Sequence, residues 1–310
     1  MPASSARLGF GLAAVGRPAY ITTDRDDDLG TAADRSVSAL RARAHELLDE
    51  AWGLGIRYVD VARSYGRAEE FLGDWLAAHP ERRSELVIGS KWGYAYVGEW
   101  KMDAAVHERK EHSAAMFDRQ WPETRAALRS APDFFLIHSV TPDSAVLSDE
   151  AVLERMRGLR VDGVRVGLST SGPRQADVVR AAMHLDDSPF SVVQSTWNLR
   201  ESSADAALTE AHDAGWTVVI KEALANGELA RAEAGTDLDE AASGIDTDLF
   251  SLGAALGQPF ADIVLSGATT TDHLRRGVGA QVVGVSRAVL ERLAVEPADY
   301  WRRRSERPWR

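Results

Sequence analysis

Short apolar runs alternate with longer stretches of helical spacing along most of the chain. This alternation is typical of buried parallel strands that are joined by helices. Eight runs predict strands, at Leu8–Ala13, Arg57–Val61, Leu86–Lys91, Phe134–His138, Val164–Ser169, Val192–Thr196, Thr217–Lys221 and Ile263–Ser266. Eight strand–helix units in one chain favour a closed (β/α)8 barrel over an open sheet.

The stretches between these runs carry apolar residues at helical spacing. The clearest extends from Arg41 to Leu54, and Gly55 follows it as a candidate C-cap. The same spacing predicts helices at Glu69–Ala78, Glu150–Arg160, Ala176–Met183, Ala204–Ala214 and Asp272–Gly279. No Pro/Ser/Gly-rich linker divides the chain, so we expect a single domain over residues 1–310.

Three long irregular stretches follow predicted strands. They are Ala19–Ser38 after the first strand, Gly93–Ser113 after the third and Asn226–Thr247 after the seventh. In a (β/α)8 barrel such loops rise from the C-terminal face, where active sites are built. We therefore expect these stretches to form lids and substrate-binding loops.

Charge and cysteine content narrow the classes of partner. The net charge of −11 argues against a nucleic-acid surface, because a polyanion would be repelled. The one dense basic cluster, Arg302–Arg304 with Arg307 and Arg310, is predicted to be a solvated tail. The chain has no cysteine, which excludes disulfides, thiolate metal sites and a cysteine nucleophile.

No apolar run approaches the roughly 18 residues that a membrane-spanning helix needs. Together with the lack of cysteine, this predicts a cytoplasmic protein with no membrane partner. The sequence does not determine its oligomeric state.

Four reactive side chains emerge from three consecutive predicted strand ends. Asp60 and Tyr65 follow the second strand, Lys91 ends the third and His138 ends the fourth. The carboxyl ends of parallel strands meet at one face of a barrel. Each residue alone has a structural explanation, but titratable groups that cluster in this way favour a reaction centre.

The segment Asp60-Val61-Ala62-Arg63-Ser64-Tyr65-Gly66 resembles the Asp-Thr-Ala-x-x-Tyr-Gly signature of aldo-keto reductases, with Val61 where threonine is common. The resemblance spans nearly the whole chain, from the first predicted strand to the last. It implies an NADP(H)-dependent oxidoreductase that interconverts a small aldehyde or ketone, such as a sugar or an aromatic compound, and its alcohol. NADP is the favoured cofactor, and NAD stays open.

The resemblance also implies a role for each residue of the centre. Adding hydride to a carbonyl carbon develops negative charge on the oxygen, so the site must supply a proton and hydrogen-bond donors. Tyr65 would be the acid in reduction and the base in oxidation, and Lys91 would lower its pKa. Asp60 would keep Lys91 charged, and His138 would donate to the carbonyl oxygen. The cofactor would supply the hydride.

Further positions are implied to bind the cofactor. Ser169, Thr170 and Gln194 would hold the nicotinamide carboxamide, and Trp197 would stack on its ring. The pyrophosphate and adenosine would meet a second set of residues, namely Glu222, Leu224, Gly227, Gly267, Thr269, His273 and Arg276. His273 and Arg276 depart from the family pattern, and Glu222 is expected to pair with Lys221.

Aromatic and charged residues of the loops are candidates for the substrate pocket. They are Tyr20, Arg63, Trp92, Tyr94 and Trp100. The segment His107–His112 lacks metal-ligand spacing and is predicted to be solvated, so no metal is expected. Within it, Arg109 and Lys110 are candidates for contacting an acidic substrate.

Two other hypotheses compete with a reductase. One is a nucleotide-binding regulatory or redox-sensing barrel that acts through protein contacts, but a sensor would not need all four residues of the centre. The other is an isomerase or aldolase that uses Lys91 as a Schiff-base amine. Such an amine must be neutral, and a partnership with Asp60 argues against that.

Overall fold

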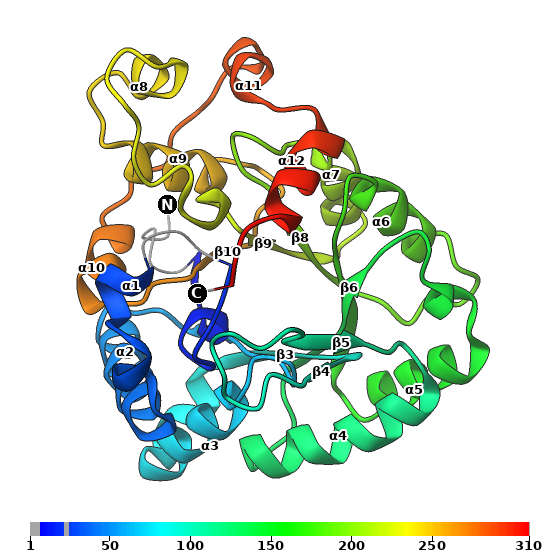
Figure 1. Cartoon of the computed structure of the whole chain (residues 1–310). Helices are drawn as coiled ribbons and strands as arrows, with labels where there is room; N and C mark the ends of the chain where they lie inside the picture. The colour runs from blue at the N-terminus through cyan, green and yellow to red at the C-terminus, as the bar shows by residue number, and fades with distance from the viewer. Residues whose placement is uncertain (1–6, 22–24, 310) are drawn as a thin grey trace.

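Eight parallel strands close into a barrel, with neighbours in the order β1-β10-β9-β8-β7-β6-β3-β2 (Figure 1). The computed structural model describes residues 7–21 and 25–309. The barrel strands are β1 (Leu8–Gly11), β2 (Tyr58–Asp60), β3 (Val87–Trp92), β6 (Phe134–Val140), β7 (Arg165–Thr170), β8 (Val192–Thr196), β9 (Thr217–Lys221) and β10 (Ile263–Ser266). The (β/α)8 prediction is confirmed, and the last three strands have the predicted bounds.

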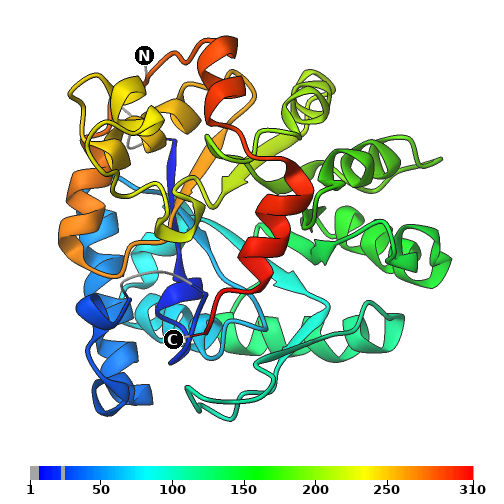
Figure 2. The same ribbon diagram turned by 45° about the horizontal axis from the view of Figure 1, so that its top comes forward.

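Helices surround the barrel (Figures 1 and 2). They are α1 (Arg25–Leu29), α2 (Val37–Gly53), α3 (Ala68–Ala78), α4 (Ala114–Leu128), α5 (Glu150–Val161), α6 (Gln175–Met183), α7 (Asp205–Asp213), α8 (Asp237–Ala242), α9 (Thr247–Leu256), α10 (Thr271–Val278), α11 (Arg287–Leu293) and α12 (Pro297–Ser305). None of the described helices is long and apolar enough to cross a membrane.

Helix α2 shows how local sequence sets its bounds. It starts four residues before the predicted start because Ser36 caps it, accepting a hydrogen bond from the backbone N–H of Ala39. Gly55 follows its C-terminus with a φ of 84°, a conformation that glycine adopts without strain. The C-cap residue is Leu54, so the predicted glycine lies one position beyond it, where it ends the helix.

Two apolar clusters hold the barrel together. A small one fills its interior, with Tyr58, Phe134, Leu136, Val192 and Val219. A larger one lies between the strands and the helices. Because side chains alternate along a strand, the next inward positions after Tyr58, Leu136 and Val192 are Asp60, His138 and Gln194. The barrel interior therefore changes from apolar to polar toward the carboxyl ends of its strands.

The sequence patterns missed several elements, among them the short helices α1 and α8 within two stretches that were expected to be irregular. Helix α4 escaped prediction because Pro122 interrupts an otherwise helical stretch. The stretch Gly93–Ser113, expected to be irregular, contains an antiparallel hairpin of β4 (Tyr94–Tyr96) and β5 (Glu108–Lys110).

Strand β6 is irregular where it delivers His138. Its register with β7 shifts between Ile137 and Val140, and Ser139 has a φ of 51°. The backbone N–H of Ser139 donates to Ser169 Oγ at 2.7 Å. Bulges of this kind re-aim a side chain next to a site.

The basic C-terminal cluster is not a solvated tail throughout. Arg304 forms a forked ion pair with Glu222, with Nε 3.0 Å from Oε2. Arg307 binds Glu228 and the backbone oxygen of Ala225, while Arg302 and Arg303 are exposed. Arg310 lies outside the described residues. The prediction was wrong for Arg304 and Arg307, because Arg304 in α12 and Arg307 just after it pair with carboxylates of the segment that follows β9.

Replacing Arg304 with methionine should lower the free energy of unfolding by about 2–3 kcal/mol, because Glu222 would lose its main partner in a buried site. Urea unfolding of full-length protein would measure this. Arg302→Met is the matched control, because Arg302 lies in the same helix but is exposed. It should change stability by less than about 0.5 kcal/mol. Equal effects of both variants would contradict the assignment.

A second prediction concerns two helical glycines. A Cβ on Gly73 of α3 would lie 2.0 Å from the backbone oxygen of Ala127, whereas a Cβ on Gly158 of α5 meets no atom within 4 Å. Gly73→Ala should destabilise the protein by about 1–3 kcal/mol through overpacking. Gly158→Ala should stabilise it by about 0.5–1 kcal/mol. Chemical denaturation tests both, and a stabilised Gly73→Ala variant would refute the close packing of α3 on α4.

Candidate active site

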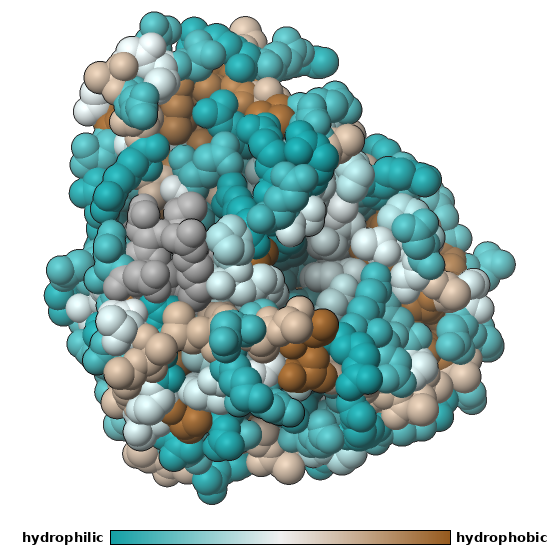
Figure 3. Space-filling model, viewed as in Figure 1, coloured by the Kyte–Doolittle hydropathy of each residue, from teal (hydrophilic) through white to brown (hydrophobic). Residues whose placement is uncertain are grey.

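A cavity of about 1140 Å³ lies at the carboxyl ends of the barrel strands. The space-filling view shows this face hollowed near its centre, with a mainly hydrophilic rim (Figure 3). One part of the cavity wall includes Asp60, Tyr65 and His138, and another includes Thr269 and His273. The stretches Ala19–Ser38, Gly93–Ser113 and Asn226–Thr247 all contribute to the wall, as predicted.

The carboxylate of Asp60 joins three strands. Its Oδ2 lies 2.5 Å from Lys91 Nζ, which also donates to the backbone oxygen of Val61 at 3.0 Å. Its Oδ1 accepts from Gln194 Nε2 at 2.7 Å, across the barrel from β8. Both Asp60 and Lys91 are buried, so each charge depends on the other. The predicted partnership of Asp60 with Lys91 is present.

Tyr65 lies directly above this ion pair. Its ring centroid is 4.7 Å from Lys91 Nζ and 5.4 Å from the ring of His138. Only 8% of Tyr65 is exposed. The geometry therefore brings together all four residues that the strand ends predicted.

Burial sets the protonation of Tyr65. Burial and the nearby Asp60 carboxylate raise its pKa well above the ordinary value of 10. The net shift is upward, opposite to the lowering expected from Lys91, because burial is the largest effect and the Asp60 carboxylate adds to it. Tyr65 is consequently a neutral phenol that holds its proton near neutral pH.

His138 is held neutral beside Tyr65. Burial, followed by the positive charge of Lys91, lowers its pKa well below 6.5. Its Nδ1 lies 3.3 Å from Ser64 Oγ. The ring of Tyr94 lies 5.1 Å from its ring and closes the other side. A neutral imidazole in this position can donate one N–H without carrying charge.

Sequence reasoning missed Arg17, a buried cation beneath the same tyrosine. Its guanidinium carbon lies 5.2 Å from the Tyr65 ring centroid and 4.9 Å from that of Tyr20. Arg17 donates to the backbone oxygen of Ser64 and to Glu108 at 2.7 Å. A charged residue within the apolar stretch after the first strand was the available signal.

Trp309 completes this wall from the C-terminal segment. Its ring stacks on His107 with centroids 4.5 Å apart and planes 8° apart, and the Arg17 guanidinium lies 4.7 Å from it. The segment after α12, red in Figure 1, runs back toward the centre of the barrel. His107 is only 7% exposed, and His112 Nε2 donates a hydrogen bond to the backbone oxygen of His138 at 2.7 Å. The prediction that His107–His112 is a solvated segment is therefore wrong for the two histidines, whereas Arg109, Lys110 and Glu111 are exposed.

The loop after β9 carries a second buried charge network. Glu222 binds Arg304, and its carboxylate lies 3.9 Å from Lys221 Nζ. Arg304 and Lys221 outweigh the effect of burial and lower the pKa of Glu222 to about 2. Lys221 donates to Thr196 Oγ1 at 2.7 Å. The expected Lys221–Glu222 pair exists, but Arg304 is the closer partner of Glu222.

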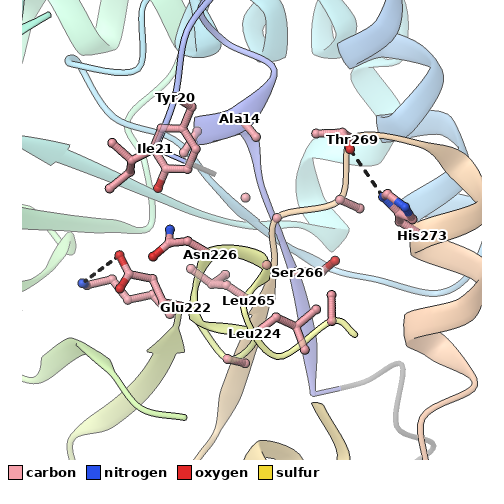
Figure 4. Close-up of a pocket in the computed structure, with 18 of the residues that line it drawn as sticks. Ala14, Tyr20, Ile21, Glu222, Leu224, Asn226, Leu265, Ser266, Thr269 and His273 are labelled. Carbon is pink, nitrogen blue, oxygen red and sulfur yellow. Dashed lines mark hydrogen bonds and ion pairs between the residues drawn. The ribbon is translucent and has the colours of Figure 1, made fainter. Parts of the chain in front are cut away.

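The far part of the cavity is formed by α10 and the loops that face it. Figure 4 shows Thr269 and His273 on the opposite side of the cavity from Tyr20 and Glu222. Leu224, Gly227, Gly267 and Arg276 also line the cavity. All of these residues, except Tyr20, were predicted to bind the cofactor.

Three predicted cofactor residues do not line the cavity. Ser169 is buried, and its hydroxyl accepts the Ser139 N–H of the β6 bulge. Thr170 bonds with Gln175 and Ser195 inside the barrel wall. Trp197 is buried with its indole N–H on Asp205 and its ring 6.4 Å from that of Phe260. A stacking role for Trp197 is corrected, because its ring is part of the core.

Three predicted substrate residues also lie outside the cavity lining. Arg63 pairs with Glu69 and Glu123. Trp92 is fully buried against Phe117, with ring centroids 5.2 Å apart. Trp100 donates its indole N–H to the backbone oxygen of Arg35 at 2.9 Å. Of the predicted substrate residues, Tyr20 and Tyr94 line the cavity.

No group of three or more metal-ligating side chains occurs among residues 7–21 and 25–309. The charged groups of the cavity are instead organised as ion pairs, such as Asp60 with Lys91 and Arg17 with Glu108.

The family model for the Aldo/keto reductase family matches residues 28–289. The chain belongs to the aldo/keto reductase family. Members of this family interconvert carbonyl compounds and alcohols with a nicotinamide cofactor.

Curated relatives of this aldo/keto reductase are distant or match only short segments. It is 26% identical to the uncharacterized oxidoreductase YqkF of Bacillus subtilis, over 79% of this chain and 84% of the relative. An aryl-alcohol dehydrogenase of Pestalotiopsis microspora is 41% identical over 51 residues, which are 16% of this chain and 13% of the relative. A pyridoxal 4-dehydrogenase of Microbacterium luteolum is 46% identical over 61 residues, 19% of this chain and 17% of the relative. The chain thus spans less than a fifth of the length of these last two.

Solved structures of aldo/keto reductases share the fold. The holo form of an aldo-keto reductase from Bacillus halodurans superposes with a TM-score of 0.68 at 18% identity, covering 94% of this chain and 92% of that one. A glycerol dehydrogenase from Gluconobacter oxydans gives a TM-score of 0.66 at 20% identity, covering 96% and 92%. At these identities the comparison establishes the barrel alone.

Proposed function

We propose that this aldo/keto reductase reduces an aldehyde or ketone to its alcohol with NADH or NADPH, acting in the cytoplasm as one barrel domain over residues 1–310. The observation that carries the proposal is the Asp60–Lys91 ion pair beneath Tyr65, with His138 at the edge of the same ring. This group lies at one part of a cavity that is large enough for a cofactor and a substrate.

Tyr65 is the proton donor in the proposed reaction. As a C–H bond forms at the carbonyl carbon, the electrons of the C=O π bond move to the oxygen, which takes the Tyr65 proton. The raised pKa of Tyr65 keeps the phenol protonated before the reaction, so the residue is in the form that reduction needs.

Two cations stabilise the phenolate that Tyr65 becomes. Lys91 Nζ lies 4.7 Å and the Arg17 guanidinium 5.2 Å from its ring centroid. Each is held by a carboxylate, Asp60 for Lys91 and Glu108 for Arg17. The pairs fix both cations in place before the proton moves, and such preorganised charge is what stabilises a transition state.

His138 is proposed to orient the carbonyl oxygen. Its lowered pKa keeps the imidazole neutral, so it would donate a hydrogen bond and leave proton transfer to Tyr65. The β6 bulge and the Ser64 contact hold the ring toward the cavity.

The residues of the cavity fit a nicotinamide dinucleotide. A Cβ on Gly267 would project into open space, so backbone there can approach a ligand closely. The N-terminus of α10, beside Thr269 and His273, offers backbone N–H groups to a phosphate. When bound, the reduced nicotinamide supplies the hydride. The sequence favoured NADP and left NAD open, and the proposed chemistry is the same with either.

The substrate is proposed to be a small polyol-related or aromatic carbonyl compound. Tyr20, Tyr94 and Trp309 give the cavity aromatic walls, and Glu108 and Lys221 add polar groups. Such walls suit sugars and aromatic aldehydes alike. The Schiff-base alternative loses support, because Lys91 is fully buried and paired.

Tyr65→Phe should lower kcat for carbonyl reduction by at least about 100-fold, because the proton donor is removed. Nucleotide affinity, measured by fluorescence titration, should stay nearly unchanged. Tyr96→Phe is the matched control, since Tyr96 lies in the hairpin outside the cavity lining, and it should keep its activity. Full turnover by Tyr65→Phe would remove this residue from the acid role.

Reduction should also depend on the charge of Lys221. Burial lowers the pKa of Lys221 to about 8, so the side chain is charged below that pH and neutral above it. A positive charge on the cavity wall stabilises the developing oxyanion, so kcat/KM for reduction should fall as pH rises through about 8. Lys221→Met should abolish this inflection, whereas Lys101→Met, an exposed control, should keep it. An unaltered inflection in Lys221→Met would assign it to another group.

A further inference from the structure

We propose that the cavity prefers NADH to NADPH, because Asp246 and Asp248 form ion pairs with Arg276, the arginine that would otherwise bind a 2′-phosphate. The inference rests on the proposed function and names its cofactor. It concerns Arg276, which lines the cavity from α10 together with His273 and Gly277.

The position of the adenosine follows from the cavity itself. The nicotinamide must lie where Tyr65 and His138 face the cavity, because hydride and proton are delivered to one carbonyl group. The rest of the dinucleotide must then extend along the same cavity, toward the wall of Thr269, His273 and Arg276. Figure 4 shows Thr269 and His273 on the side opposite Tyr20.

Arg276 is held by a fork of carboxylates at this wall. Its Nη2 lies 2.5 Å from Asp246 and 2.8 Å from Asp248, and its Nε donates to the other Asp248 oxygen. The two aspartates raise the pKa of Arg276 further above its ordinary value. Two carboxylates around one guanidinium leave this group of three with a net negative charge.

Other side chains add to the negative charge of this part of the cavity. Thr269 Oγ1 donates to Asp28, whose carboxylate also lies 3.8 Å from His273 Nδ1. Besides His273, the charged or titratable side chains that α1 and residues 228–276 contribute to the cavity lining are Asp27, Asp28, Asp239, Asp246, Asp248, Arg231 and Arg276. Carboxylates outnumber guanidiniums among them, so the local field opposes an added anion.

The two nucleotides differ in the charge that they bring to this part of the cavity. NADPH carries a 2′-phosphate, which would displace Asp246 and Asp248 from Arg276 and leave both carboxylates facing it. Like charges placed together in a binding site oppose binding. NADH presents a ribose 2′-hydroxyl there, and a carboxylate accepts a hydrogen bond from that group. The arrangement therefore favours the nucleotide that lacks the phosphate.

Calorimetric titration of the full-length protein with NADH and with NADPH tests the preference directly. We expect NADH to bind at least about tenfold more tightly at low salt, and the ratio to shrink as salt screens the carboxylates. Displacement of bound NADH by 5′-AMP and by adenosine 2′,5′-bisphosphate isolates the adenosine part. The 5′-AMP should compete better.

Variants identify the residues responsible. The double variant Asp246→Asn, Asp248→Asn frees Arg276 and should tighten NADPH binding by at least about tenfold with little change for NADH. Adding Arg276→Met to it should remove the gain. Asp118→Asn is the matched control, because Asp118 also holds an arginine in a forked pair, Arg155, and does not line the cavity. It should leave both affinities unchanged.

Several results would overturn the inference. NADPH binding as tightly as NADH would do so, as would an unchanged ratio in the double variant. Tight NADPH binding that Arg231→Met abolishes would move the phosphate site to Arg231. All of these outcomes leave the proposed reductase intact, whereas no heat with either nucleotide would remove the proposed function as well.

Discussion

The buried carboxylate of Asp60 is the constraint on which the rest of the site depends. A charge in the interior of a barrel is tolerated only with partners, and both of its oxygens have one, Lys91 from the neighbouring strand and Gln194 from across the barrel. These bonds fix the relative heights of β2, β3 and β8 at the level where the interior changes from apolar to polar. Tyr65 and His138 are then placed above a rigid polar floor.

The same pairing explains the electrostatics above it. Burial raises the pKa of Tyr65, and the Asp60 carboxylate that pairs with Lys91 raises it further, so Tyr65 keeps its proton. Burial, followed by the positive charges of Lys91 and Lys221, lowers the pKa of His138 and keeps it neutral. Charge is balanced near the reaction centre, whereas carboxylates are in excess around Arg276. One cavity thus joins two electrostatic environments, one for proton transfer and one for recognition of the nucleotide.

The sequence predicted what periodicity and strand ends encode. The eight strands and the meeting of Asp60, Tyr65, Lys91 and His138 follow from which residues end consecutive strands. The direction in which a side chain faces was harder to predict, because a shift of one residue along a strand moves a side chain from the cavity wall to the core. Trp197 and Ser169 were predicted to face the cavity but are buried. Partners far apart in sequence, such as Arg304 with Glu222, leave no local pattern at all.

The contact between Arg17 and Trp309 joins the first βα loop to the C-terminal segment. Almost the entire chain forms the loop that this contact closes, and the conformational entropy lost in closing a loop grows with its length. Part of the wall around Tyr65 is therefore built from contacts between the two ends of the described chain, those of Trp309 with Arg17 and Tyr20. Contacts between residues far apart in sequence slow folding. A barrel whose strands have already paired would still lack a finished cavity until this last segment docks.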